Sequence, residues 1–287
     1  MGWSPDGRWL TWCDCSSSES GRAPDRIYLA RGDGSGAVAL PNVPAISGVM
    51  WAPDSSRFYV LGIIIGGKPT WGTLYAVDPR SPQSTSAVHL DAAYPAYALS
   101  PDGALLAYVN FELQVVVSRL DGAGFTALAD SNKKDPPRTL AWSPDGRRLA
   151  FLMVDGGVTR LAIARADGSA LSYAGEFPSG AVGLAGWSPD GKYVAVSWTE
   201  GTPAGGEGRL TAAATDSSRA SKTFNTGGWS HAPSRWWPDF RGLYFIGRGD
   251  DFRGEVVSNN HLFAVGLDGS DRQVAAEAVS GFVGVVP

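Results

Sequence analysis

The side chains most able to do chemistry gather in two segments near the C-terminal end of the sequence. The first, 227–235, carries Trp229, His231 and Arg235. The second, 247–261, carries Arg248, Asp250, Asp251, Arg253, Glu255, Asn259, Asn260 and His261. Indole, imidazole, guanidinium and carboxylate groups that face one opening can bind a polar ligand or a segment of a partner protein. We therefore predict a ligand- or partner-binding site formed by Trp229, His231, Arg235, Arg248, Asp250, Asp251, Arg253 and His261.

Other chemistry in these segments has less support. Two carboxylates could form an acid/base pair, but spacing along the chain does not set their separation, so we predict no catalytic residue. His231, His261 and Asp250 could ligate a metal, yet we predict neither a metal site nor a cofactor. The alternative that these residues lie in ordinary solvated loops stays open. Cys13 and Cys15 are too close in sequence for an unstrained disulfide, so we interpret them as ordinary strand residues.

Composition argues against two classes of partner. The net charge is −4 and no run of Lys or Arg exceeds a pair, whereas a nucleic-acid binder usually presents a basic face. No apolar run reaches 18 residues, so we predict no membrane insertion. The sequence also starts without a basic and apolar leader, so we expect no signal peptide.

A five-residue motif recurs along the whole chain. It reads Trp-Ser-Pro-Asp-Gly in its best copies, and the copies start 43 to 49 positions apart. The six copies occupy 3–7, 51–55, 99–103, 142–146, 187–191 and 236–240. Proline presets φ for a β-turn, and glycine accepts a positive φ. Each copy therefore predicts a tight turn between two antiparallel strands.

A second series of turns, typically Asp-Gly, alternates with the first. Its copies lie at 32–35, 77–79, 120–122, 166–169, 215–217 and 267–270. The segment after each motif reads as a strand, as at 8–13, 57–61, 105–109, 148–153, 193–198 and 243–246. Another strand precedes each second turn, as at 26–29, 74–77, 113–117, 161–164, 210–214 and 262–265. Each repeat therefore holds four strands.

Four-stranded units repeated at this period predict an all-β fold, a six-bladed β-propeller with four antiparallel strands per blade, in one domain spanning 1–287. Only two residues precede the first motif, so the first blade lacks its inner strand in this interpretation. The tail 279–284 aligns with 46–51. We expect this C-terminal strand to close the first blade.

The motif, the apolar strand after it and the Leu-Asp-Gly turn resemble the TolB-like, WD-like β-propeller repeat family. The resemblance covers nearly the whole chain and implies a repeat protein that binds a protein or peptide, in the periplasm or outside the cell. Prolyl-oligopeptidase-type enzymes carry similar repeats, but their Gly-x-Ser-x-Gly nucleophile turn is missing here. The nearest string is Gly228-Trp229-Ser230-His231-Ala232.

The two turn series lie at one end of the strands, so we interpret their aspartates as structural and the motif tryptophans as core residues. Arg31-Gly32-Asp33 and Arg248-Gly249-Asp250 are interpreted as coincidental matches to an adhesion tripeptide. The longer connections, where function usually lies, occupy the opposite end at 14–25, 62–72, 131–138, 200–209, 227–235 and 247–261.

We therefore predict a non-enzymatic binding or scaffold propeller with a protein or peptide partner, for which a small polar ligand is an alternative occupant. A hydrolase or lyase acting on carbohydrate or peptide is a second alternative. A third is that the chain is a propeller fragment of a larger multidomain protein.

Overall fold

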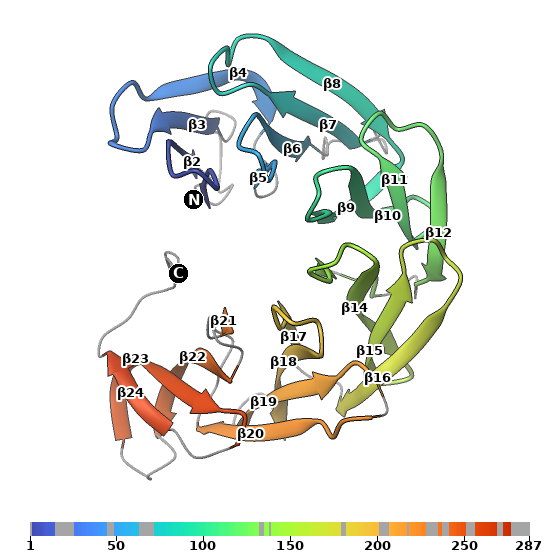
Figure 1. The fold of residues 1–287 in the computed structure, drawn as a ribbon, viewed down its shortest axis with the longest axis vertical. Helices are drawn as coiled ribbons and strands as arrows, with labels where there is room; N and C mark the ends of the chain where they lie inside the picture. The colour runs from blue at the N-terminus through green and yellow to red at the C-terminus, as the bar shows by residue number, and fades with distance from the viewer. Residues whose placement is uncertain are drawn as a thin grey trace, which may run out of the picture. The chain divides into compact units, whose positions relative to one another are not determined.

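The computed structural model describes most of the 287-residue chain. The described residues are 2–14, 26–44, 49–62, 72–131, 135–137, 139–178, 182–200, 207–216, 218–227, 235–236, 241–250, 256–268 and 272–276. Their regular structure consists of β-strands, arranged in six four-stranded antiparallel sheets (Figure 1). No helix in this part of the chain is long and apolar enough to cross a membrane.

The chain divides into two compact units, and the first, Met1–Lys133, holds three sheets. The first sheet consists of β1 (Gly2–Trp3), β2 (Trp9–Asp14), β3 (Arg26–Arg31) and β4 (Val38–Pro44). The second consists of β5 (Val49–Trp51), β6 (Phe58–Gly62), β7 (Gly72–Val77) and β8 (Thr85–Leu90). The third consists of β9 (Ala92–Leu99), β10 (Leu105–Asn110), β11 (Gln114–Arg119) and β12 (Phe125–Asp130).

The second unit, Lys134–Pro287, holds the other three sheets. The fourth sheet consists of β13 (Leu140–Trp142), β14 (Arg148–Asp155), β15 (Val158–Arg165) and β16 (Leu171–Pro178). The fifth consists of β17 (Gly183–Trp187), β18 (Tyr193–Glu200), β19 (Glu207–Ala214) and β20 (Lys222–Gly227). The sixth consists of β21 (Arg235–Trp236), β22 (Gly242–Asp250), β23 (Val256–Gly266) and β24 (Arg272–Ala276). In every sheet the strands follow one another in sequence order.

The motif turns are held together by a buried serine. In the fourth sheet, the Ser143 hydroxyl donates to Asp145 Oδ1 at 2.6 Å and accepts from the Arg148 N–H at 2.9 Å. Gly146 follows at a φ of 66°, which suits glycine. The same serine bonds recur in the first, third and fifth sheets, at Ser4, Ser100 and Ser188. The motif therefore forms the turn between the first and second strands in these four sheets, and the second sheet has a turn at the same place, where the Ser55 N–H donates to the Ala52 carbonyl. Residues 237–240 of the sixth copy lie outside the described residues.

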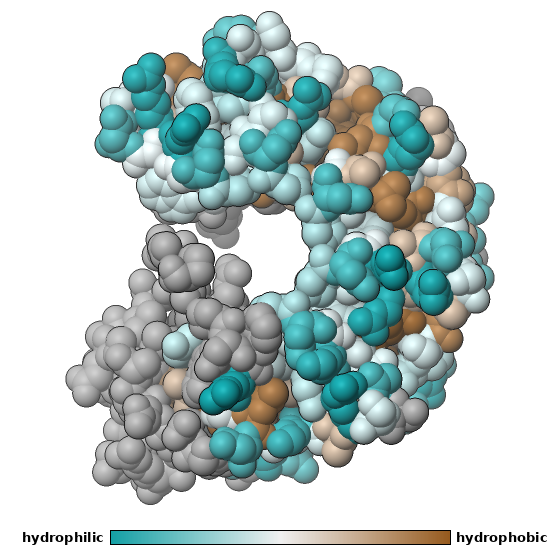
Figure 2. Space-filling view, viewed as in Figure 1, coloured by the Kyte–Doolittle hydropathy of each residue, from teal (hydrophilic) through white to brown (hydrophobic). Residues whose placement is uncertain are grey.

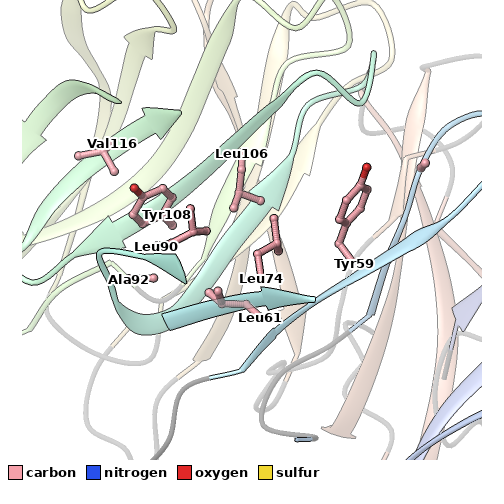
Figure 3. Packing of buried hydrophobic residues seen from close by; sticks show 9 residues of the cluster. Tyr59, Leu61, Leu74, Leu90, Ala92, Leu106, Tyr108 and Val116 are labelled. Atoms are coloured by element: carbon pink, nitrogen blue, oxygen red, sulfur yellow. The ribbon is translucent and has the colours of Figure 1, made fainter. Parts of the chain in front are cut away.

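Apolar side chains fill the spaces between neighbouring sheets within each unit. Between the second and third sheets, a buried cluster combines Tyr59, Leu61, Leu74, Leu90, Ala92, Leu106, Tyr108 and Val116 (Figure 3). A comparable cluster joins the first and second sheets, and two more lie in the second unit. Burying one such large side chain stabilises a fold by about 1.5–3 kcal/mol, so neighbouring sheets stabilise each other.

Two motif tryptophans add a hydrogen bond between neighbouring sheets. Trp187 Nε1 donates to the Ala141 carbonyl at 2.9 Å, and Trp236 Nε1 donates to the Gly186 carbonyl at 3.2 Å. Each of these carbonyls belongs to the residue directly before the motif tryptophan of the preceding sheet. In the first sheet the corresponding carbonyl is that of Gly2, and it accepts a hydrogen bond from the Thr11 hydroxyl at 3.0 Å.

Two expectations about the first sheet need correction. The first sheet has an inner strand of its own, because β1 pairs with β2 through Gly2–Thr11 and Trp3–Leu10. Trp3 is also 43% exposed, whereas Trp142 and Trp187 are buried, so the interpretation as a core residue is wrong for Trp3. The tail 279–284 lies outside the described residues.

Candidate functional site

The predicted site residues fall on the sixth sheet or outside the described residues. Arg235 begins β21 opposite Tyr244, and His261 lies in β23 opposite Gly247. Arg248 and Asp250 lie in β22. Trp229, His231, Asp251 and Arg253 lie outside the described residues. The structure therefore assigns four of the eight residues to strands, all in one sheet.

The expectation of a long loop at 247–261 is wrong for most of that segment. Strand β22 continues to Asp250 and β23 begins at Val256, and these two residues face each other in register. Two adjacent valines, 256 and 257, favour an extended backbone, which explains why the strand starts this early. The register shifts between Gly247 and Gly249. Three residues, 258–260, thus lie where the partner strand has one.

The structure also places a polar depression at the turn ends of the first and second sheets. It has a volume of about 750 Å³. Its lining residues are Asp6, Gly7, Arg8, Trp9, Arg31, Gly32, Asp33, Asp54, Ser55, Ser56 and Arg80. In Figure 2 much of the visible surface over the first two sheets is hydrophilic.

Comparison with the fourth and fifth sheets shows what differs at this depression. There Arg148 occupies the corresponding junction, where its Nη2 donates to the Gly191 carbonyl at 2.9 Å and its guanidinium lies 4.6 Å from the centre of the Trp187 ring. Trp9 is the counterpart of Arg148, because both lie six residues after their motif tryptophans. The junction of the first two sheets therefore has an indole where the other has a guanidinium.

The second sheet departs from the motif at the same place. Ser55 replaces the motif glycine at a φ of 59°, which is unfavourable for a residue with a side chain. Its hydroxyl accepts the Asp6 N–H at 3.0 Å and so ties the turn of the second sheet to that of the first. Backbone strain of this kind often marks functional positions.

Each carboxylate of the depression accepts hydrogen bonds from residues of its own turn. Ser4 donates to Asp6 and, together with the Arg8 N–H, holds the pKa of that carboxyl below its usual range. The Ser35 side chain and N–H do the same to the pKa of Asp33. The Ser56 N–H lowers the pKa of Asp54. All three carboxylates are therefore ionised near neutral pH and poorly suited to donate a proton.

The sequence interpretation assigned this end of the strands a structural role only and missed the depression. Two signals were present: Ser55 in a glycine position, and Trp9 where other copies carry a smaller or charged residue. Neither could reveal a cavity, because a cavity depends on how the turns of two sheets meet. Among the described residues, no group of three or more His, Cys, Asp or Glu is placed to hold a metal ion.

Comparisons with known proteins agree with this architecture. The family model of the anaphase-promoting complex subunit 4 WD40 domain matches residues 97–169. TolB from Acinetobacter baumannii superposes with a TM-score of 0.53 at 14% identity, over 86% of this chain and 58% of that one. The fold is a β-propeller. The propeller thus spans less than two thirds of the length of the TolB structure.

Two enzymes share the propeller fold over more of their length. Oligogalacturonate lyase from Vibrio parahaemolyticus superposes with a TM-score of 0.63 at 12% identity, over 96% of this chain and 76% of that one. The periplasmic gluconolactonase of Pseudomonas aeruginosa gives 0.61 at 16% identity, over 97% and 84%. At such identities the likeness shows the fold alone. A search of curated proteins found no significant match to the sequence.

Proposed function

We propose that this chain is a non-enzymatic binding propeller that engages a protein or peptide through the connections opposite the turn ends, as a scaffold or sensor component of an envelope or signalling system. The observation that carries the proposal is the extended hairpin of β22 and β23. These strands span nine and eleven residues, the longest among those described. The hairpin combines a register shift with three of the predicted site residues, Arg248, Asp250 and His261, and Arg235 lies in the same sheet.

Features of the hairpin support recognition. The shift places Arg248 opposite a three-residue stretch that includes Asn259 and Asn260. Irregular pairing of this kind redirects side chains and is common next to binding sites. Its charged and amide residues offer both donors and acceptors to a peptide. The proposed site also includes Trp229, His231, Asp251 and Arg253.

We further propose that six blades form one ring, closed by the tail 279–284. Because Gly2 and Trp3 already pair with β2, the tail would pair with the remainder of β2, at Trp12–Asp14, in line with β1. The tail would therefore pair with only three residues of β2, fewer than the six residues of the sequence alignment. About half of the tail would extend the inner strand.

A peptide-display experiment tests the binding role. Immobilised protein is panned against a random peptide library, and enriched peptides are measured against a variant with Arg248, Asp250 and His261 changed to alanine. We expect enrichment of a defined sequence pattern and at least about tenfold weaker binding to the variant, because charge-assisted hydrogen bonds are lost. The matched control changes Arg165 and Asp167 to alanine, an ion pair of 3.8 Å at a turn of the fourth sheet. No enrichment, or equal loss in both variants, would contradict the proposal.

An enzyme acting on carbohydrate or peptide is the second candidate, favoured by the shared fold with a lyase and a lactonase over nearly the whole chain. Its test is turnover of oligogalacturonate, gluconolactone and proline-containing peptides. Turnover that is lost in Asp250→Asn and Asp251→Asn, with folding unchanged, would replace the binding proposal. Purified protein that converts none of these substrates at any pH between 5 and 9 removes this candidate for those substrate classes.

A further inference from the structure

The polar depression of the first two sheets has an aromatic floor. Trp9 is partly buried, packs against the cluster formed by Ile27, Leu29, Phe58 and Val77, and also lines the depression. One part of the indole is thus supported by the core while another part faces the cavity. An indole presents a flat apolar surface to a ligand together with one N–H donor.

The walls of the depression supply both hydrogen-bond donors and acceptors. Three of the turns around it contain an arginine and an aspartate two positions apart, and the turn with Asp54, Ser55 and Ser56 does not. Arg8 Nε lies 3.7 Å from Asp6 Oδ2, and Arg80 Nε lies 3.2 Å from Asp78 Oδ1. Arg31 adds to the factors that lower the pKa of Asp33, after the Ser35 bonds.

The formal charges of the lining residues balance, because three arginines and three aspartates line the depression. Arg8 pairs with Asp6 inside the lining, whereas the partner of Arg80 is Asp78, which is not a lining residue. A ligand with a single sign of charge would be attracted by one member of each pair and repelled by the other. A neutral ligand with many hydroxyls avoids this conflict, since each hydroxyl both donates and accepts.

From the floor, the walls and the charge balance together, we propose that this depression is a binding site for a neutral carbohydrate. The sugar would place the C–H groups of one ring face on Trp9, donate hydroxyls to the carboxylate oxygens and accept from the guanidinium groups. A volume of about 750 Å³ lies within the range of about 300–1,000 Å³ common for small-ligand sites. The site lies at turns of the first and second sheets, whereas the proposed peptide site lies in the sixth sheet, and it does not depend on that site.

The charge state predicts how binding responds to conditions. The lowered pKa values of Asp6, Asp33 and Asp54 keep all three carboxylates ionised well below neutrality. Binding of a neutral sugar is therefore expected to stay constant from pH 5 to pH 9. It is also expected to depend little on salt, because no net charge is neutralised on binding.

The test is a glycan array probed with the full chain, followed by calorimetry with the neutral oligosaccharide that binds best. Trp9→Arg introduces an arginine at the position that Arg148 occupies between the fourth and fifth sheets. We therefore expect the arginine to fill the depression and binding to fall at least about tenfold. Arg31→Ala is expected to weaken binding in the same direction. Circular dichroism checks that both variants keep their sheets.

The matched control is Arg119→Ala. Arg119 forms the same kind of turn pair, with its Nε 3.3 Å from Asp121 Oδ2, but in the third sheet and away from the depression. It is expected to leave binding unchanged. Three outcomes would overturn the proposal: no neutral glycan bound, binding confined to uronic acids or to peptides, or equal loss in Arg119→Ala and Arg31→Ala. Loss of peptide binding in the hairpin variant would not affect the sugar result, so the two proposals fail separately.

Discussion

At the scale of single residues, the motif serine explains the repeat better than its more conspicuous tryptophan. Ser143 is fully buried and satisfies both the Asp145 carboxylate and the Arg148 N–H. Three other sheets keep this arrangement, whereas the second sheet has Ala52 in the serine position. The chain therefore contains its own comparison between a turn with the hydroxyl and a turn without it.

This comparison yields a reciprocal prediction. Ser143→Ala is expected to lower the free energy of unfolding by about 1–3 kcal/mol, because a buried N–H loses its acceptor. Ala52→Ser is expected to raise it by about 1 kcal/mol, since the new hydroxyl can reach Asp54 and the N–H of Arg57. Urea denaturation of both variants measures the two effects. A destabilised Ala52→Ser would show that the apolar cluster around Ala52 leaves no room for the hydroxyl.

Acid should weaken the same turns. The serine hydroxyls are the main cause of the lowered pKa at Asp6, Asp102 and Asp145. A lowered pKa in the folded state means that the turn contributes stability above the unfolded pKa of about 3.9. This contribution is lost as the pH falls through the lower folded value. Thermal melts are thus expected to hold steady from pH 7 to about pH 5 and to drop below pH 4.

The Ser143→Ala variant serves as the control for this pH dependence. Without the hydroxyl, Asp145 has a folded pKa closer to its unfolded value. The difference in melting temperature between the variant and the parent chain should therefore shrink at low pH. A difference that grows as the pH falls would contradict the sign of the argument.

At the scale of elements, the sixth sheet contains the longest described strands and also the proposed peptide-binding site. The hairpin of β22 and β23 has two parts, separated by the register shift between Gly247 and Gly249. In the lower part, before Gly247 in β22, Leu243 pairs with Val265, and both are buried. In the upper part, from Gly249 onward, Gly249 pairs with Val257. The lower part belongs to the core of the sheet, and the upper part is an extension.

Proline substitutions can separate these parts. Val257→Pro removes a backbone donor in the extension, so we expect faster hydrogen exchange around Gly249 with nearly the same melting temperature. Val265→Pro makes the same change in the lower part and is expected to unfold the second unit, with a loss of about 3 kcal/mol or more. Hydrogen exchange followed by mass spectrometry distinguishes the two. Equal global destabilisation would mean that the extension is part of the core.

The elements also show what sequence could and could not predict. The strand beginning at Arg148 and the turn at 143–147 were predictable because Pro, Asp and Gly act locally on the backbone. Strand β1 was missed because a two-residue strand has no pattern of its own and depends on pairing with β2. The extension of β22 was missed because glycine and aspartate, which make up three of its last four residues, are poor strand formers. The turns were therefore predictable from local residue chemistry, whereas β1 and the extension of β22 depend on pairing with a neighbouring strand.

At the scale of the whole molecule, the proposed six-blade ring requires that something complete the first sheet. β2 spans six residues, but β1 pairs with only Leu10 and Thr11. The inner edge of β2 at Trp12–Asp14 is thus where the tail is proposed to add. Trp3 is exposed, whereas Trp187 and Trp236 each donate to a carbonyl of the sheet before. In a closed ring, that acceptor for Trp3 would be the carbonyl of Arg235.

Removing the tail tests the closure. Deletion from Val279 onward is expected to lower the melting temperature by at least about 5 °C and to split one transition into two, because each unit has its own apolar clusters. Trp3→Phe keeps an aromatic side chain but is smaller and removes the N–H donor, and should cause a smaller loss without splitting. Differential scanning calorimetry records both. A single transition at an unchanged temperature after the deletion would show that the tail does not close the first blade.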